Sequence, residues 1–216
     1  MLDLGVIVLA GGRGTRMGGV DKASVTIAGE RLLDRLMRQL PYGTPTAVVS
    51  PYHLGVPQVC ESPLFGGPVA GIAAGHAALS SIPLTAILAV DAPDSPQMLP
   101  VLRSARAAAG TDVAVASLDG RLQPLCAVWR TEALSQALSN VGSPRNQPAM
   151  RLLRQAASVT EVPGSAAARD IDTVDELRAR RAARQAGQAG QAGQAGLATR
   201  RYSGRAGPSP RWSSCG

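Results

Sequence analysis

The sequence has very few aromatic residues. Phe, Trp and Tyr together make up 3% of its 216 residues, so stacking platforms for nucleobases are nearly absent. A folded core must therefore come from aliphatic side chains, which agrees with an apolar content of 45%. No uninterrupted apolar run approaches the roughly 18 residues of a membrane-spanning helix. These shortages argue against a membrane protein and against a base-stacking nucleic-acid module.

Histidine and cysteine are also scarce, with two and three residues respectively. None of the cysteines belongs to a CxxC pair, and the sequence shows neither zinc-type spacing nor a Ser-His-Asp set. The first residues, MLDLGVIVLAGG, lack a basic stretch and a cleavage-like site, so we expect no signal peptide. We predict a cytoplasmic protein without a transmembrane segment.

Positive charge is concentrated at the end of the chain. Of the 22 basic residues behind the formal charge of +7, eight follow Glu176, where there is no acid, so the rest holds 14 basic and 15 acidic side chains. From Gln185, four QAG repeats precede a segment rich in Gly, Ser, Pro and Arg, for which we expect disorder. We predict one domain over residues 1–184 and a low-complexity basic tail over residues 185–216. Only this tail favours nucleic-acid binding, which we do not expect.

Apolar bursts alternate with helical patterns along the first domain. The predicted strands cover Leu4–Ala10, Ala47–Ser50, Ala86–Val90, Asp112–Ser117 and Pro124–Arg130. The predicted helices cover Glu30–Leu40, Pro68–Leu79, Pro96–Ala109, Thr131–Leu138, Pro148–Ala157 and Asp175–Gln185. Such alternation is typical of the α/β class, here a three-layer α/β/α sandwich with a mostly parallel, Rossmann-like sheet. In such sheets ligands bind at the carboxyl ends of the strands.

The stretch LAGGRGTRMGGVDK, Leu9 to Lys22, directly follows the first predicted strand. It matches neither the P-loop pattern nor the dinucleotide-binding GxGxxG pattern. Its glycines nevertheless let a ligand approach the backbone, and exposed N–H groups in such a turn form a cradle for anions. Arg16 and Lys22 add positive charges that suit phosphate groups. The stretch therefore predicts a phosphate-binding loop, and the alternative is a Gly-rich turn with solvated cations.

This pattern resembles the nucleotidyltransferases that activate a phosphorylated small molecule with a nucleoside triphosphate. It is most similar to the molybdenum cofactor guanylyltransferases, which are MobA-like NTP transferases of the nucleotide-diphospho-sugar transferase superfamily. The resemblance extends over roughly Leu4 to Arg184 and implies that superfamily's type of sheet. It also implies Mg²⁺-dependent transfer of GMP from GTP to the terminal phosphate of molybdopterin cofactor, with release of pyrophosphate. The implied partners are GTP and a molybdopterin-type acceptor, with molybdoenzymes or other cofactor-biosynthesis proteins as candidate protein partners.

Two later segments carry the same resemblance. GPVAG, residues 67–71, matches the family's G-P-L-A-G segment, where the backbone approaches the guanine base. ILAVDAP, residues 87–93, matches an apolar strand ending in Asp-x-Pro, whose aspartate binds the catalytic Mg²⁺ in the family. The implied catalytic residues are Arg16, Lys22 and Asp91; the alternative for Asp91 is a capping or turn aspartate.

The resemblance further implies a set of nucleotide-binding residues: Leu9, Ala10, Gly11, Gly12, Gly14, Lys22, Glu61, Gly67, Gly71 and Asp91. Glu61 falls where the family often has an aspartate, so a nucleotide contact and a solvated loop are both open for it. RDIDTVDEL, residues 169–177, resembles the family's N-x-N-T-P-E-D/E-L segment, with Asp170 and Asp172 replacing two asparagines. Some relatives use an aspartate there as a metal ligand, so the implied metal ligands are Asp91 and Asp172.

The acceptor side is less well defined. QPLCAVWR, residues 123–130, matches the family's x-P-L-x-A-x-Y/W strand near the acceptor, where Trp129 either stacks on a pterin or belongs to the core. Arg145, Asn146 and Arg151 fall where the family has polar and basic residues facing the acceptor phosphate. Transfer from GTP or CTP to another phosphorylated metabolite therefore stays open, as does a nucleotide-binding partner protein without turnover.

Overall fold

The computed structural model describes residues 3–11, 22–27 and 29–171. At its centre is a seven-stranded sheet with the order β5-β4-β1-β6-β8-β7-β9. The strands are β1 (Leu4–Leu9), β4 (Thr46–Val49), β5 (Gln58–Val59), β6 (Leu84–Ala89), β7 (Val113–Leu118), β8 (Arg121–Arg130) and β9 (Val159–Pro163). All neighbouring pairs are parallel except the two that involve β8. The predicted mostly parallel sheet is therefore confirmed, with one reversed strand.

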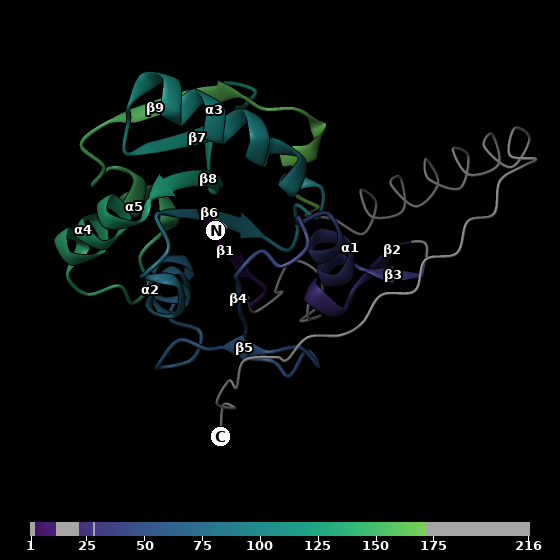
Figure 1. Ribbon diagram of the computed structural model, residues 1–216. Coiled ribbons are helices and arrows are strands. Elements are labelled where there is room, and N and C mark those ends of the chain that lie inside the picture. Colours follow the sequence, from purple (N-terminus) through teal and green to yellow (C-terminus); the bar gives the residue numbers. More distant parts are fainter. Residues whose placement is uncertain (1–2, 12–21, 28, 172–216) are drawn as a thin grey trace, which may run out of the picture.

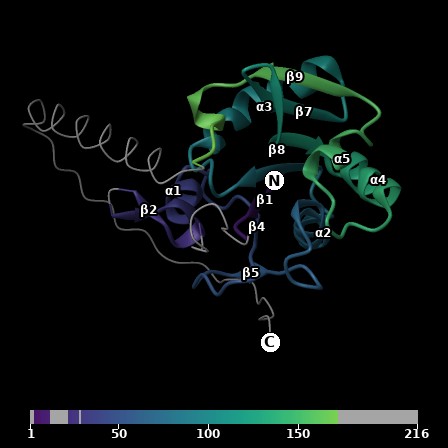
Figure 2. The ribbon, with the colours of Figure 1, turned by 180° about the vertical axis from the view of Figure 1, so that it is seen from behind.

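Helices cover both faces of this sheet. They are α1 (Leu32–Arg38), α2 (Pro68–Leu79), α3 (Leu99–Ala109), α4 (Thr131–Val141) and α5 (Ala149–Leu153), with short 3-10 helices η2 (Lys22–Ser24), η3 (Ser95–Met98) and η4 (Ala166–Ala168). Figure 1 shows α2, α4 and α5 on one side of the sheet and α1 on the other, beside the small hairpin of β2 (Thr26–Ile27) and β3 (Glu30–Arg31). The view from behind in Figure 2 shows the same layers, which confirms the predicted three-layer α/β/α sandwich.

The core consists of two aliphatic clusters, one on each face of the sheet. Along β1, Val6 and Val8 lie in the cluster that includes α1 and α3, and Ile7 lies in the cluster that includes α2, α4 and α5. All three side chains are fully buried. A strand buried on both faces needs apolar residues at successive positions, which is why VIV in the sequence indicates a central strand.

The sequence predictions of elements are mostly confirmed, with differences at the polar and very short ones. Helix α2 has the predicted bounds, and Pro68 occupies its first turn, where proline is tolerated. Strand β5 has only two residues and therefore shows no periodicity. Strand β9, VTEVP, is mostly exposed at the edge of the sheet and ends in a proline, so it lacks an apolar burst. The predicted helix Asp175–Gln185 and the predicted tail lie outside the described residues.

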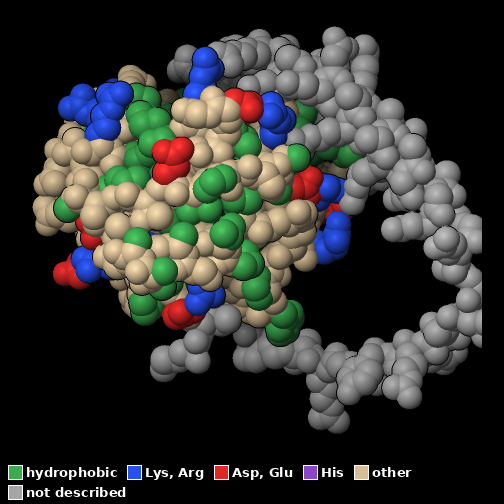
Figure 3. All heavy atoms as spheres, turned by 90° about the horizontal axis from the view of Figure 1, so that it is seen from above, with side chains coloured by type: hydrophobic (Ala, Val, Ile, Leu, Met, Phe, Trp, Pro, Cys, Tyr) green, Lys and Arg blue, Asp and Glu red, His purple; other side chains and the backbone are tan. Residues whose placement is uncertain are grey.

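The surface agrees with a nearly neutral body. In Figure 3, the face seen from above carries blue and red side chains that are interspersed, several of them side by side. Several of the ion pairs join exposed side chains, such as Arg103 with Asp3 at 2.8 Å and Arg169 with Asp119 at 3.2 Å. None of the helices in the described part of the chain has the length and apolar character needed to cross a membrane.

Two glycines let α2 lie close against the sheet. A Cβ atom at Gly75 would lie 2.6 Å from Cγ2 of Ile7, and one at Gly71 would lie 3.1 Å from Cδ2 of Leu9. Ile7 is β-branched and fully buried, so it has no alternative rotamer into which to move. The small face of α2 therefore sets the distance between this helix and β1, and with it the position of the first turn of α2.

We predict that Gly75→Val lowers the free energy of unfolding by about 1–3 kcal/mol, because the added methyl groups overpack the contact with Ile7. The control is Ala77→Val on the exposed side of the same helix, for which only the difference in helix propensity, about 0.6 kcal/mol, is expected. Chemical denaturation of both variants measures the difference. Equal losses at the two positions would show that α2 does not depend on this close approach.

Candidate functional site

The carboxyl ends of β1, β4 and β6 lie side by side, and we call this side the carboxyl end of the sheet. Beyond the strands, the N–H of Ala10 donates to the carbonyl of Val49 at 2.9 Å, and the N–H of Val90 donates to the carbonyl of Leu9 at 3.0 Å. These bonds hold the start of the glycine-rich stretch next to the residue that precedes Asp91. The structure thus brings together two motifs that are 80 residues apart in the sequence.

Gly11 lies against Pro51, which is two residues beyond the end of β4. A Cβ atom there would lie 2.5 Å from Cδ of Pro51, a distance that real Cβ atoms essentially never show. The sequence therefore needs glycine at this position for packing, in addition to any role in ligand binding. Gly12, Gly14, Arg16 and Asp172 lie outside the described residues, and Lys22 begins the 3-10 helix η2.

The GPVAG segment forms the start of α2 at the same end of the sheet. Gly67 is the N-cap residue with φ of 88° and ψ of 177°, a conformation that is essentially restricted to glycine. The N–H of Asn146 donates to the carbonyl of Gly66 at 2.6 Å. The exposed Arg145 and Asn146, which sequence reasoning placed on the acceptor side, therefore lie beside the segment expected to approach the base.

Asp91 lies two residues beyond the end of β6 and is half-buried. Its carbonyl accepts a hydrogen bond from the N–H of Ile171 at 2.9 Å, and Arg169 forms an exposed ion pair with Asp119 in the β7–β8 turn. The segment from residue 169 to residue 171 thus crosses the carboxyl end of the sheet and reaches Asp91. This meeting of the Asp-x-Pro segment with the start of RDIDTVDEL was expected from the resemblance alone.

Asp170, in the segment that reaches Asp91, also affects the pKa of a cysteine in the sheet. Burial raises the pKa of the Cys126 thiol on β8 to about 12, and the negative charge of Asp170 contributes in the same direction. Cys126 lies opposite Leu88 in the pairing of β8 with β6. The side chain of Asp170 itself is exposed.

Glu61 is buried, with 9% of its surface exposed. Its Cγ atom would be 3.6 Å from a Cβ atom at Gly66, so it lies against the backbone at the start of α2. The alternative of a solvated loop residue is therefore wrong for Glu61. Trp129, by contrast, is 1% exposed within the cluster that includes α2, α4 and α5, so it belongs to the core and does not offer a stacking surface.

One of the two predicted metal ligands, Asp91, lies at this end of the sheet. Among the described residues, no three His, Cys, Asp or Glu side chains gather in one metal site. Mg²⁺ at a nucleotide site usually takes one or two carboxylates and completes its coordination with phosphate oxygens and water. Asp91 supplies a carboxylate of this type, whereas the second predicted ligand, Asp172, lies outside the described residues.

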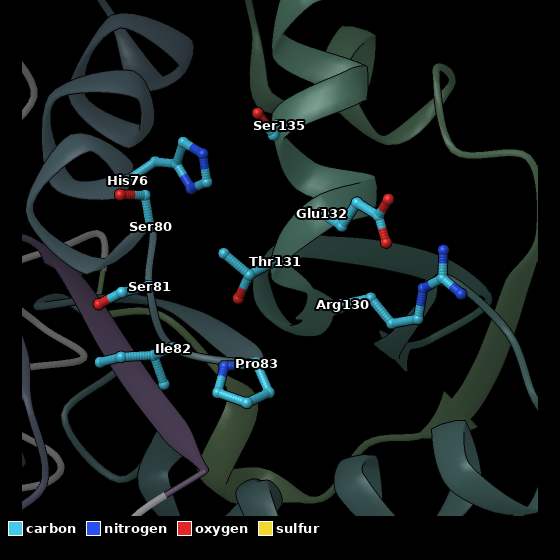
Figure 4. Close-up of a pocket in the computed structure, with 9 residues that line it drawn as sticks. All are labelled: His76, Ser80, Ser81, Ile82, Pro83, Arg130, Thr131, Glu132 and Ser135. Carbon is cyan, nitrogen blue, oxygen red and sulfur yellow. The ribbon is translucent and has the colours of Figure 1, made fainter.

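A separate cavity of about 520 Å³ opens at the opposite, amino end of the sheet. Figure 4 shows that its lining comes from the last turn of α2, the loop to β6 and the first turn of α4, with His76, Pro83 and Glu132 among the labelled side chains. Pro83 precedes β6 and Asp91 follows it, so the length of that strand separates the cavity from Asp91. None of the predicted site residues lines this cavity.

The free energy of unfolding is expected to depend on pH through His76, in the wall of this cavity. Burial lowers the pKa of this side chain below the ordinary value of 6.5. When the pH falls below about 6.5, the unfolded chain binds a proton that the folded chain does not, so the free energy of unfolding falls. We predict that His76→Gln reduces this loss relative to the unmodified chain. Urea denaturation at about pH 7.5 and about pH 5.5 measures it, with His53→Gln as the control. An unchanged pH dependence in His76→Gln would contradict the prediction.

Comparison with known proteins agrees with this geometry. The family model of the MobA-like NTP transferase domain matches residues 6–160. A molybdenum cofactor guanylyltransferase from Cupriavidus pinatubonensis is 31% identical over 192 residues, which cover 82% of this chain and 95% of the relative. Another, from Mesorhizobium japonicum, is 33% identical over 143 residues, which cover 60% of this chain and 68% of the relative.

Solved structures share the fold. Molybdopterin-guanine dinucleotide biosynthesis protein A from Archaeoglobus fulgidus has a TM-score of 0.65 at 21% identity, covering 84% of this chain and 98% of that one. The 2-C-methyl-D-erythritol 4-phosphate cytidylyltransferase from Thermus thermophilus has a TM-score of 0.60 at 21% identity, with the same coverage. At such identities the structures establish the fold alone, and the family is established by the sequence matches. The chain belongs to the MobA-like NTP transferase family.

Proposed function

We propose that this protein is a nucleotidyltransferase that moves GMP from GTP to the terminal phosphate of molybdopterin cofactor and releases pyrophosphate. The observation that carries this proposal is the meeting of three motif segments at the carboxyl end of the sheet. The glycine-rich stretch starts beside Val90, the GPVAG segment caps α2, and Ile171 reaches Asp91. The relatives named molybdenum cofactor guanylyltransferases support GTP and molybdopterin as the substrates.

In this proposal the backbone does much of the binding. Leu9 and Ala10 hold the start of the stretch at the sheet through their hydrogen bonds with Val90 and Val49. Gly11, Gly12 and Gly14 would then place the phosphates of GTP against peptide N–H groups, which attract anions without a side chain. Gly67 lets the base approach the start of α2, and Glu61 borders the same segment. Gly71 faces Leu9, so its contribution is the thin face of the helix.

The charged residues neutralise the triphosphate. Arg16 and Lys22 would lie on the phosphates, and Asp91, with Asp172, would hold Mg²⁺. When bound, this ion would supply further charge neutralisation at the phosphate oxygens. The acceptor phosphate is already an anion, so the site needs no strong general base, and the chain acts by positioning and electrostatic stabilisation.

The reaction is a substitution at the α-phosphorus of GTP. An oxygen of the acceptor's terminal phosphate forms a bond to this phosphorus, and the bond from the same phosphorus to the bridging oxygen of the β-phosphate breaks. The bonding electrons leave with pyrophosphate, the charge of which Lys22 and Arg16 would stabilise. We further propose that the reaction takes place in the cytoplasm, with cofactor-biosynthesis proteins or molybdoenzymes as recipients of the product.

The first test is pyrophosphate release from GTP, CTP, ATP and UTP, each with Mg²⁺, with and without molybdopterin. We expect release only when GTP and molybdopterin are both present. Release with CTP would move the assignment to cytidylyl transfer. Binding of GTP without release would favour another phosphorylated acceptor, and failure to bind any of the four nucleotides would favour a partner protein without turnover.

We predict that Asp91→Ala and Lys22→Ala each lower kcat at least about 100-fold, because each removes a charge that acts on the phosphates. Neither residue contributes an apolar side chain to the core, so the unfolding temperature is expected to change little. The matched control is Asp3→Ala, which removes an exposed aspartate at the amino end of β1. Near-normal turnover in either site variant would refute the assignment of that residue.

A further inference from the structure

A partly buried ion pair joins α1 to the turn that follows Asp91. The guanidinium Nη2 of Arg35, on α1, contacts Oδ1 of Asp94, and the two side chains are only 13% and 17% exposed. Nε and Nη1 of Arg35 are buried and have no hydrogen-bond partner among the described residues. Because water reaches this pair poorly, Asp94 is the group that compensates the charge of Arg35, and their attraction is screened less than that of surface pairs.

Gln39, one turn further along, contacts the same turn. Its amide Nε2 donates to the carbonyl of Pro93 at 2.8 Å and to Oδ1 of Asp94 at 3.3 Å. Its Oε1 accepts a hydrogen bond from the side chain of Gln97 at 2.8 Å. Arg35 of α1 and Gln39, the C-cap residue of this helix, therefore together hold residues 93 and 94, which lie two and three positions beyond Asp91.

The other end of α1 is attached to the segment of Lys22. The N–H of Leu32 donates to the carbonyl of Val25 at 2.9 Å. Ala23, in η2, is 1% exposed and belongs to the same buried cluster as Leu33 and Leu36 of α1. The backbone of η2, which Lys22 begins, is thereby packed against α1 as one unit. Helix α1 thus connects Lys22 at one end with the turn of Asp91 at the other.

We propose that Arg35 and Asp94 are positioning residues of the transfer reaction. Neither needs to touch GTP or the acceptor, because their ion pair fixes where the turn of Asp91 sits relative to the segment of Lys22. The inference rests on the proposed function, in which Lys22 and Asp91 act on the same triphosphate. Sites that depend on positioning lose much of their rate when a carboxylate moves by about 1 Å. The pair therefore contributes to catalysis through Asp91 and not through binding of the nucleotide.

The test is steady-state kinetics of GTP- and molybdopterin-dependent pyrophosphate release, with Mg²⁺ titrated, for the full chain and its variants. Asp94→Asn keeps the shape of the side chain and removes its charge. We expect a kcat about 10–100-fold lower and a higher Mg²⁺ concentration for half-maximal rate, with a smaller change in KM for GTP. Arg35→Lys keeps a positive charge opposite Asp94 and is expected to retain most of kcat.

The matched control is Asp34→Asn, on the same helix. Asp34 pairs with Arg31 at 2.7 Å, and their side chains are 45% and 37% exposed, so loss of this pair is expected to leave kcat and the Mg²⁺ requirement unchanged. Circular dichroism and thermal unfolding establish the folded fraction of each variant. If Asp94→Asn does not fold, Asp94→Glu replaces it, since it keeps the charge and displaces the carboxylate by one methylene, and it is expected to lower kcat less severely.

Three results would overturn the inference, and they are distinguishable. If the unmodified chain releases pyrophosphate and the Asp94 variant that folds keeps the same kcat and Mg²⁺ requirement per folded molecule, the pair is purely structural. If the unmodified chain shows no release with GTP and molybdopterin, the proposed function fails, and the positioning role fails with it. If Arg35→Lys lowers kcat as much as Asp94→Asn does, the opposite charges of the pair are not what positions Asp91, and this result also overturns the inference.

Discussion

Everything at the carboxyl end of the sheet depends on the hydrogen bonding of β1. This strand is paired in parallel with β4 on one side and β6 on the other, and its side chains are buried on both faces. In the register of these pairs, Leu9 lies opposite Val49 and Ala89, the last residues of β4 and β6, so the three strands end together. The glycine-rich stretch, Pro51 and Asp91 therefore leave the sheet as neighbours. Backbone pairing therefore brings these segments together, and their side chains are neighbours for that reason.

The scarcity of aromatic residues has a structural counterpart in this arrangement. Because Ala, Val, Leu and Ile fill the core, the helices lie close to the sheet. Gly71 and Gly75 bring α2 still closer to β1. The single described tryptophan, Trp129, lies within the core. A thin layer between α2 and the sheet leaves little freedom for the first turn of the helix, which the proposed function places beside the nucleotide base.

Much of the fold, and the meeting of the motif segments, could be predicted from the sequence. The apolar run before the glycine-rich stretch predicts β1, and the position of Asp91 at the end of another apolar burst follows the same logic. The burial of Glu61 could not be predicted, because it depends on how the loop after β5 folds against Gly66. The pairing of Arg35 with Asp94 is also invisible in the sequence, since 59 positions separate the two residues and no periodicity relates them.

The reversed direction of β8 gives one strand access to both ends of the sheet. Its first residues follow the Asp119–Gly120 turn at the carboxyl end, where Asp119 pairs with Arg169. Its last residue, Arg130, lines the cavity at the amino end. Between them, β8 pairs with β6 and β7 along the middle of the sheet. Asp119 in this turn pairs with Arg169, which lies two residues before Ile171, the residue that contacts Asp91. A length change in the Asp119–Gly120 turn would therefore be transmitted to the segment at Asp91 through the surface, without passing through the two core clusters.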